Sequence, residues 1–468
     1  MKIKLALLIS FLVFLVFGNL GIIKATGAEE TETETEVMET EETETEATQI
    51  SPYDRVQEVE AAPGVETQIT TSERVTVHYC PAIYGDKIIW YNNNYGTGSD
   101  ICMYDLSTST MSNISDNEFD EYDPVIYKDR IVWIDSRNGH PEIYMYNLST
   151  STESRITNFR SFKAGPDVYE DRIVWFDMRN GNYDIYMYDL ANSTETQITF
   201  NESGQTSPSI YGDRIVWTDS RNGQENTDIY MYNISTARES QLTKNESDQL
   251  GPAIYDDKIV WTDMRNGNAD IYMYNLSTCE EYQITTNEYV QANPAIYEDK
   301  IVWVDCRGKQ SGAYPDSDIY IYDLSTSKEM SVVTEGSSQS DPDIYGNRIV
   351  WVDNRDRHWQ HYNIYMFTLE TSEEPGAAEP VEGLKKLKDY LNSLCLQLST
   401  ATVLGARLDS AIAYLEKGDE EKSLTELENF IECVYSMQEK GRLEDKEVEC
   451  IVSETQRSID LMKIPDRI

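Results

Sequence analysis

The residues best able to do chemistry in this chain are carboxylates, because 83 acids face only 39 lysines and arginines. Acids recur in a fixed pattern, Asp-x-Arg, which occurs six times between Asp135/Arg137 and Asp353/Arg355. A calcium loop needs acids at alternate positions, and here an arginine stands where the second ligand should be. We therefore interpret each pair as a charge-assisted lock on a hairpin, and we predict no metal site and no cofactor.

Motifs of nucleophilic, metal-assisted or phosphate chemistry do not occur in the sequence. It contains no G-x-S-x-G, no H-E-x-x-H, no P-loop and no Cys-x-x-Cys pair among its seven cysteines. We therefore name no catalytic residue. Two carboxylates can still converge as they do in a glycosidase. An extracellular carbohydrate-active or peptide-cleaving enzyme that uses carboxylates near a central channel therefore stays open as the alternative function.

Histidines and irregular aromatic residues mark the candidate ligand-binding positions. All four histidines lie in or beside segments that we expect on one face of the fold, and two segments, GKQSGAYPDS and NRDRHWQHYN, break the repeat described next. Exposed aromatic residues on loops of a rigid scaffold are typical ligand contacts. Random drift of loop residues is the competing explanation. The predicted ligand-binding set is Trp359, Tyr362, His358, His361, Lys309, Tyr314, His78 and His140.

These residues are carried by a unit of about 42 residues that is repeated seven times. Each copy has one tryptophan, and these are Trp90, Trp133, Trp175, Trp217, Trp261, Trp303 and Trp351. Such a unit is too short to bury a core alone, and its period is typical of propeller blades. Each unit predicts four strands, as in PAIY, KIVWTD, DIYMYNL and EYQIT within residues 252–285.

The last copy lacks its fourth strand, and the N-terminal side of the repeats supplies one. Residues 66–70 read ETQIT, which is identical to residues 195–199 in the third copy. Closing the ring in this way removes an exposed sheet edge. The sequence therefore predicts a mainly β fold, a seven-bladed β-propeller over residues 65–374 that is closed by an N-terminal strand.

A polar position lies three residues before the proline that opens each unit. By strand alternation we predict that these side chains form a ring at the mouth of the central channel. Simple packing of polar strand starts is the alternative. The predicted channel-mouth residues are Glu121, Lys163, Gln205, Gln249, Gln291 and Gln339, with His78 in the first blade.

The two ends of the chain predict further segments. Residues 1–28 read as a secretory signal peptide, with an uncleaved membrane anchor as the alternative. Residues 29–64, rich in Thr and Glu, predict an acidic disordered spacer. A linker at 375–382 precedes helical periodicity, which predicts a four-helix bundle at 383–468. The net charge of −44 excludes nucleic acid as a partner.

Seven N-glycosylation sequons occur in the sequence. Three of them share the turn after the third strand, where a turn residue explains the asparagine equally well. In a secreted chain the sequons predict possible attachment sites for sugar. They begin at Asn113, Asn147, Asn192, Asn201, Asn233, Asn245 and Asn275.

The repeated Asp-[Lys/Arg]-Ile-Val-Trp-x-Asp-x-Arg-Asn-Gly-x-x-Asp-Ile-Tyr resembles the TolB-like (PD40/WD40-like) propeller repeat of surface proteins. The chain departs from that family's Ser-Pro-Asp-Gly turn and keeps only an acid before the basic residue. Residues 383–462 look like the FIMAH-type helical module appended to secreted proteins. The resemblance implies a fold and not a function, because this scaffold serves binding proteins and peptidases alike.

The function predicted from these features is that of a non-enzymatic secreted or cell-surface protein. Its propeller would present a binding face to a carbohydrate or a cell-envelope protein. We expect an extracellular or cell-surface location, a monomer, and membrane contact only through the N-terminal segment if that segment is uncleaved.

Overall fold

The computed structural model describes most of the β region and part of the C-terminal region. The described ranges are 59–71, 76–94, 98–307, 316–334, 337–355, 362–370, 384–385, 387–388, 398–415, 417, 419–440, 448, 451–452, 455 and 459. The predicted signal peptide at 1–28, most of the predicted spacer at 29–64 and the linker at 375–382 lie outside these ranges.

Seven four-stranded antiparallel sheets confirm the predicted propeller. In each blade the first strand is the innermost one, and these strands are β2 (Thr76–Tyr84), β6 (Glu121–Tyr127), β10 (Lys163–Tyr169), β14 (Gln205–Tyr211), β18 (Gln249–Tyr255), β22 (Gln291–Tyr297) and β26 (Gln339–Tyr345). The second strands are β3 (Lys87–Asn94), β7 (Arg130–Asp135), β11 (Arg172–Asp177), β15 (Arg214–Asp219), β19 (Lys258–Asp263), β23 (Lys300–Asp305) and β27 (Arg348–Asp353).

The outer half of each blade is built from a long third strand and a short fourth strand. The third strands are β4 (Gly98–Asp105), β8 (Glu142–Asn147), β12 (Asp184–Asp189), β16 (Asp228–Asn233), β20 (Asp270–Asn275), β24 (Asp318–Asp323) and β28 (Asn363–Leu369). The fourth strands are β5 (Thr110–Asn113), β9 (Thr152–Arg155), β13 (Thr194–Gln197), β17 (Arg238–Gln241), β21 (Glu280–Gln283), β25 (Lys328–Val333) and, in blade 7, β1 (Gly64–Gln68).

The propeller core lies between adjacent blades. The repeated Ile-Val-Trp of the second strands is apolar on both faces, and all seven tryptophans are completely buried. In blade 5, for example, Ile259 and Trp261 pack with Val216 and Ile229 of blade 4. Two-sided burial is expected when each sheet is covered by a neighbour on either side.

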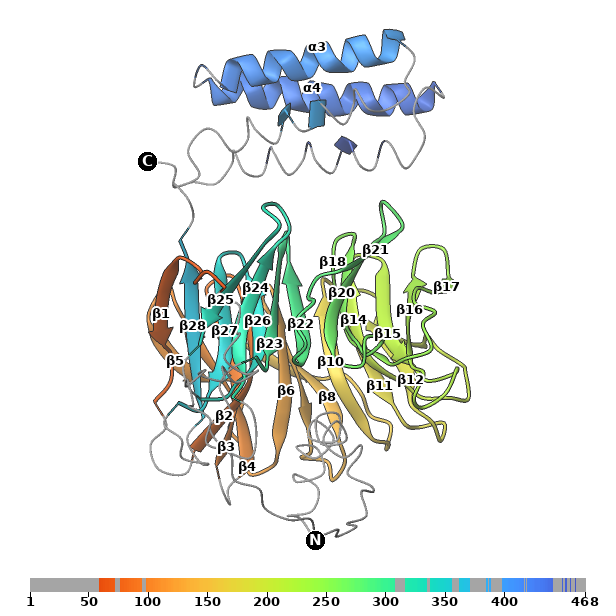
Figure 1. Cartoon of the computed structure of the whole chain (residues 1–468). Coiled ribbons are helices and arrows are strands. Elements are labelled where there is room, and N and C mark those ends of the chain that lie inside the picture. The colour runs from red at the N-terminus through yellow and green to blue at the C-terminus, as the bar shows by residue number, and fades with distance from the viewer. Residues whose placement is uncertain are drawn as a thin grey trace, which may run out of the picture. The chain divides into compact units, whose positions relative to one another are not determined.

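The ring closes as the sequence predicted. The N-terminal β1 pairs antiparallel with β28, from Gly64 opposite Leu369 to Gln68 opposite Tyr365. Figure 1 shows the orange β1 beside the blue β28. The preceding segment also crosses to blade 6, where Ala61 forms a parallel bridge with Ser331. The N-terminal segment therefore ties the last two blades together.

The C-terminal region is helical, which fits the predicted small helical module. Its two continuous helices are α3 (Leu398–Leu415) and α4 (Glu420–Glu439). Asp419 caps α4 by accepting a hydrogen bond from the backbone N–H of Lys422 at 3.4 Å. The other predicted helices fall on stretches of which single described residues, such as Leu387 and Ile451, join the same buried core. Among the described residues, no helix has the length and apolarity needed to span a membrane.

Candidate functional site

Two kinds of connection meet on one side of the propeller, which we call the loop face. The connection after the second strand touches the segment that leads into the same blade, as when Met264 N–H donates to the carbonyl of Asp248 at 2.9 Å. The connection before the third strand touches the start of the next blade, as when Gln249 N–H donates to the carbonyl of Thr227 at 2.9 Å. The two kinds of connection therefore lie on the same face, as predicted from the order of the strands, and are hydrogen bonded to one another.

Five of the predicted ligand-binding residues, His358, Trp359, His361, Lys309 and Tyr314, lie outside the described residues. Tyr362 is described and lies just before β28 in blade 7. Its ring packs against Tyr79 of blade 1, with ring centroids 5.5 Å apart, and Tyr79 in turn packs against Tyr91 at 5.4 Å. An aromatic cluster therefore joins blades 7 and 1 at the loop face.

The structure corrects the prediction for His78 as an exposed ligand contact. The side chain is 5% exposed and packs edge-on against Trp90. Its Nδ1 lies 2.5 Å from Oδ1 of Asn92, and burial lowers the pKa of the imidazole. His78 is thus a buried residue at the boundary between blades 7 and 1.

His140, the remaining predicted contact, is only partly buried. Its Nε2 lies 2.6 Å from Oε1 of the fully buried Glu142. The structure places His140 at blade 2, beside the boundary with blade 3, and not in the cluster around Tyr79 and Tyr362.

The structure places the six predicted channel-mouth residues between blades. Each side chain is completely buried, which fits the alternative of simple packing of polar strand starts. The reason is their place in the sheet: each begins a first strand and stands opposite the last acid of the second strand, as Gln249 stands opposite Asp263. These residues are Glu121, Lys163, Gln205, Gln249, Gln291 and Gln339. They lie where two blades meet, and we call each such place a junction.

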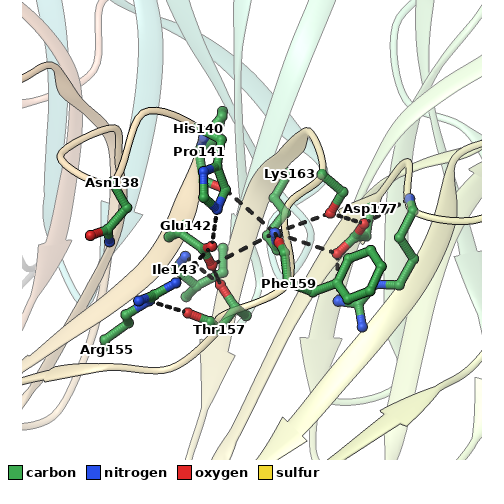
Figure 2. A network of polar contacts seen from close by, with 12 residues as sticks. Asn138, His140, Pro141, Glu142, Ile143, Arg155, Thr157, Phe159, Lys163 and Asp177 are labelled. Atoms are coloured by element: carbon green, nitrogen blue, oxygen red, sulfur yellow. Dashed lines mark hydrogen bonds and ion pairs between the residues drawn. The ribbon is translucent and has the colours of Figure 1, made fainter.

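The junction between blades 2 and 3 contains a buried ion network (Figure 2). The ammonium of Lys163 lies 3.7 Å from Oε2 of Glu142 and 3.9 Å from Oδ2 of Asp177. Burial lowers the pKa of Lys163, while the two carboxylates act against that shift. Glu142 also binds Arg155 at 3.1 Å. Lys163 is therefore held by charge on both sides of the junction.

The Asp-x-Arg pairs form the predicted locks. In blade 5, Asp263 accepts a hydrogen bond from the indole of Trp261 at 2.9 Å and from the guanidinium of Arg265 at 2.8 and 2.5 Å. The same guanidinium binds Glu281 at 2.5 Å and lies 4.2 Å from the ring centre of Tyr272. One arginine thereby connects the second, third and fourth strands of its blade.

An axial cavity of about 460 Å³ lies inside the ring of first strands. Its lining includes Asp167, Asp341 and Asp343, and no basic residue is among the described residues that line it. Burial raises the pKa of Asp167 and of Asp343 to about 6. Both side chains accept backbone hydrogen bonds from the next blade, from Ile210 and Ile83, at 2.8 Å. These two carboxylates therefore connect neighbouring blades.

Seven tyrosines form a closed ring in the same cavity, where each first strand ends. Neighbouring ring centroids are 4.6 to 5.1 Å apart all the way round. Burial raises the pKa of the Tyr84 phenol, and the neighbouring phenol of Tyr345 adds to the effect. The ring consists of Tyr84, Tyr127, Tyr169, Tyr211, Tyr255, Tyr297 and Tyr345.

Exposed apolar side chains on the loop face were missed by the sequence reasoning. Phe119, Phe159 and Phe200 lie in three successive connections, between blades 1 and 2, 2 and 3, and 3 and 4. Their exposed fractions are 47%, 49% and 76%. Met178, in the connection after the second strand of blade 3, is exposed by 44%. The signal that could have revealed them is their place: a large apolar residue in a connection that is otherwise polar.

Two further predictions concern metal binding and glycosylation. Across the described residues, no group of three or more His, Cys, Asp or Glu is arranged to hold a metal ion. Asn147, Asn233 and Asn275 accept backbone hydrogen bonds from the third residue onward, at 2.9, 2.9 and 3.0 Å, so each shapes its turn. Attachment of sugar to the seven sequons stays a prediction.

Solved structures share the propeller. Oligogalacturonate lyase from Vibrio parahaemolyticus matches with a TM-score of 0.52 and 10% identity over 66% of this chain and 94% of that one. A puromycin hydrolase matches with a TM-score of 0.52 and 11% identity, over 68% of this chain and 58% of that one. The β-propeller domain of the Trilobed protease from Pyrococcus furiosus matches with a TM-score of 0.50 and 13% identity, over 65% of this chain and 98% of that one. At these identities the likeness shows the fold alone.

TolB structures are also among the matches, for example TolB from Acinetobacter baumannii at a TM-score of 0.37 and 16% identity, over 63% of this chain and 79% of that one. We draw no conclusion from a match at that TM-score, and the likeness to solved structures is confined to the propeller fold. No protein-family model matches the sequence, and no curated protein matches it. The FIMAH-type assignment of the helical region stays a prediction.

Proposed function

We propose that the protein is a non-enzymatic extracellular binding protein that uses the loop face of blades 1 to 4 to hold a carbohydrate or a cell-envelope protein. The observation that carries the proposal is the row of exposed phenylalanines, Phe119, Phe159 and Phe200. Exposed aromatic groups in connections of a rigid scaffold are typical binding groups, because the scaffold has already met the cost of positioning them.

The surroundings of Phe159 support this proposal. The guanidinium of Arg179 lies 5.0 Å from the ring centre of Phe159, and the same group is held by Asp177 at 2.6 Å. The aromatic ring is therefore backed by a fixed polar group. A flat apolar ring beside fixed hydrogen-bond donors suits a sugar ring or an aromatic side chain of a partner protein.

The carboxylates of the repeat support a binding protein over an enzyme. The Asp-x-Arg acids hold an arginine and a tryptophan, as Asp263 does, and Asp167 and Asp343 hold backbone N–H groups of the next blade. A general acid or base must reach a substrate proton, and a group that is already hydrogen bonded on both oxygens does so poorly.

A second candidate function is an extracellular carbohydrate-active or peptide-cleaving enzyme that works in the axial cavity. It is favoured by Asp123, which precedes Pro124 of the cavity lining and whose pKa is raised to about 6 by burial and by Asp341, a lining residue. A carboxyl group with that pKa suits a general acid near neutral pH. Turnover of an envelope polysaccharide or peptide that disappears in Asp123→Asn would establish this function.

The test of the binding function compares two sets of exposed apolar residues. The variant Phe119→Ser/Phe159→Ser/Phe200→Ser is applied with the parent protein to a glycan array and to extracted envelope proteins. We expect at least a tenfold loss of binding, with an unchanged melting temperature. The matched control is Met111→Ser/Tyr282→Ser, which removes residues of 53% and 40% exposure from the fourth strands. Equal binding by both variants and the parent would overturn the proposal.

A further inference from the structure

The seven junctions share one plan but differ in charge. Each contains an acid or amide of a third strand, a polar first-strand residue of the next blade, and an acid or amide of that blade's second strand. Between blades 1 and 2 these are Asp100, Glu121 and Asp135. Between blades 2 and 3 these are Glu142, Lys163 and Asp177. Between blades 4 and 5 they are Asp228, Gln249 and Asp263.

At two junctions the chain itself supplies cations for the acids or has no acids. Between blades 2 and 3, the Lys163 ammonium lies between the carboxylates of Glu142 and Asp177, which also bind arginines. Between blades 7 and 1, both acids are replaced by amides, Asn363 and Asn92, and the residue between them is the buried His78. An isolated buried charge costs several kcal/mol, so charge and counter-charge must change together.

The four glutamine junctions keep both acids and have a neutral residue between them. Gln205, Gln249, Gln291 and Gln339 are completely buried, and in each the Oε1 atom has no hydrogen-bond partner among the described residues. The Nε2 atom is already used, as when that of Gln291 donates to the carbonyl of Tyr289 at 2.7 Å. Each junction therefore contains a buried amide oxygen that accepts no hydrogen bond from the described residues.

Three of the four third-strand acids of these junctions, Asp184, Asp228 and Asp270, bind neutral donors. Asp228 accepts from Asn222 at 2.6 Å, from Gln241 at 3.1 Å and from Thr243 at 3.2 Å. Burial raises the pKa of Asp228, and the carboxylate of Asp219 adds to the effect. For Asp318 burial raises the pKa to about 7, with further contributions from other carboxylates that include Asp353 across the junction. The second-strand acids have their arginines, so each junction is short of one positive charge.

From this comparison we propose that each glutamine junction binds a buried monovalent cation, Na⁺ or K⁺, at the position that the Lys163 ammonium takes between blades 2 and 3. The ligands are the third-strand acid, the Oε1 of the glutamine and the second-strand acid. All are hard oxygen donors, which suit an alkali or alkaline-earth cation. Two acids, one of them already neutralised by arginine, match a single positive charge better than a divalent ion.

The first test measures thermal unfolding of the full chain in KCl or NaCl and in choline chloride at equal ionic strength. Screening of surface charge is then the same, but choline is too large for a buried site. Because a ligand that binds only the folded state stabilises it, we expect a higher melting temperature in KCl or NaCl, by roughly 2–4 °C for each filled site. Equal melting temperatures in all three salts would overturn the proposal in favour of bridging water or a bound proton.

Two exchanged residues sharpen this test. Gln249→Lys places an ammonium in a glutamine junction and should reduce the difference between the salts by one site. Lys163→Gln makes the opposite exchange and should increase the difference. If either variant fails to fold, crystals of the parent protein grown in RbCl decide the matter. Anomalous peaks at the four glutamine junctions and none beside Lys163 support the proposal, and their absence from all four overturns it.

Discussion

The polar groups around the buried tryptophan differ between blade 5 and blade 1. In blade 5 a charged set, Asp263 with Arg265 and Glu281, surrounds the buried Trp261. In blade 1 the indole of Trp90 donates to Asn92 at 2.6 Å, and the Asn92 amide donates to Sγ of Cys102 at 2.9 Å. The tryptophan is completely buried in both blades. The fold therefore requires an acceptor for the indole N–H, and either a carboxylate or a neutral amide oxygen can provide it.

Blade 1 also adjoins the place where the ring closes, and this gives the largest expected effect. Deleting residues 64–70 removes β1 and leaves β28 as an exposed edge, which loses several hydrogen bonds and invites aggregation. We expect a melting temperature lowered by roughly 10 °C or more, measured by circular dichroism. Val65→Thr, at a residue that is 62% exposed, keeps the ladder and is the control. An unchanged melting curve for the deletion would contradict closure by β1.

Removing the carboxylate acceptor of the indole should destabilise the protein more than removing the amide acceptor. Asp263→Ala removes the buried partner of the partly buried Arg265 and leaves it only Glu281, so we expect a loss of about 3–5 kcal/mol in the free energy of unfolding. Asn92→Ala removes neutral hydrogen bonds only and should cost about 1–3 kcal/mol. Urea denaturation measures both. Equal losses would show that charge adds nothing to the lock.

The junctions on either side of blade 1 should respond to pH in opposite directions. Burial lowers the pKa of His78, so the unfolded state binds more protons and stability falls as the pH drops through about 6.5. Burial, and next the nearby Asp135, raise the pKa of Glu121 to about 8. Its contribution to stability is therefore fully present below about pH 4.5 and is lost as the pH rises from there through about 8.

Single substitutions separate these two limbs of the pH profile. His78→Gln, which copies the residue of four other junctions, should flatten the acid limb of a plot of melting temperature against pH. Glu121→Gln should flatten the fall in melting temperature between about pH 4.5 and pH 8. A profile that either substitution leaves unchanged would show that the residue does not titrate on unfolding.

The smallest effect is expected at the outer end of the lock. Glu281, which is partly exposed, binds Arg265 at 2.5 Å, so Glu281→Gln should cost about 0.2–1 kcal/mol. In blade 1 the corresponding Met111 is exposed, and Met111→Gln should change the stability by less than that. Denaturation in low and high salt tests the contrast, because only the first loss should shrink as salt screens the pair.

The repeat made the fold predictable, and departures from the repeat limited the prediction of the site. Identity between ETQIT at 66–70 and 195–199 was sufficient to place β1 in blade 7, because a strand must find a partner. Strand alternation was not sufficient to place Gln249. A bulge between Leu250 and Ala253 shifts the register, and the neighbouring blade covers the strand start. Burial between two blades depends on the whole ring and is not a property of one strand.

The register of β1 and β28 also determines how the propeller resists force. Gly64 lies opposite Leu369, so the chain enters β1 and leaves β28 at the same end of the ladder. A pull on the two continuations of the chain would load the ladder bonds one after another, as a zipper opens, and not all together in shear. The first bonds to carry the load are those of Ser331 with Glu60 and Ala62, at 3.0 and 2.8 Å. These two bonds to blade 6 therefore carry the load before the β1–β28 ladder does.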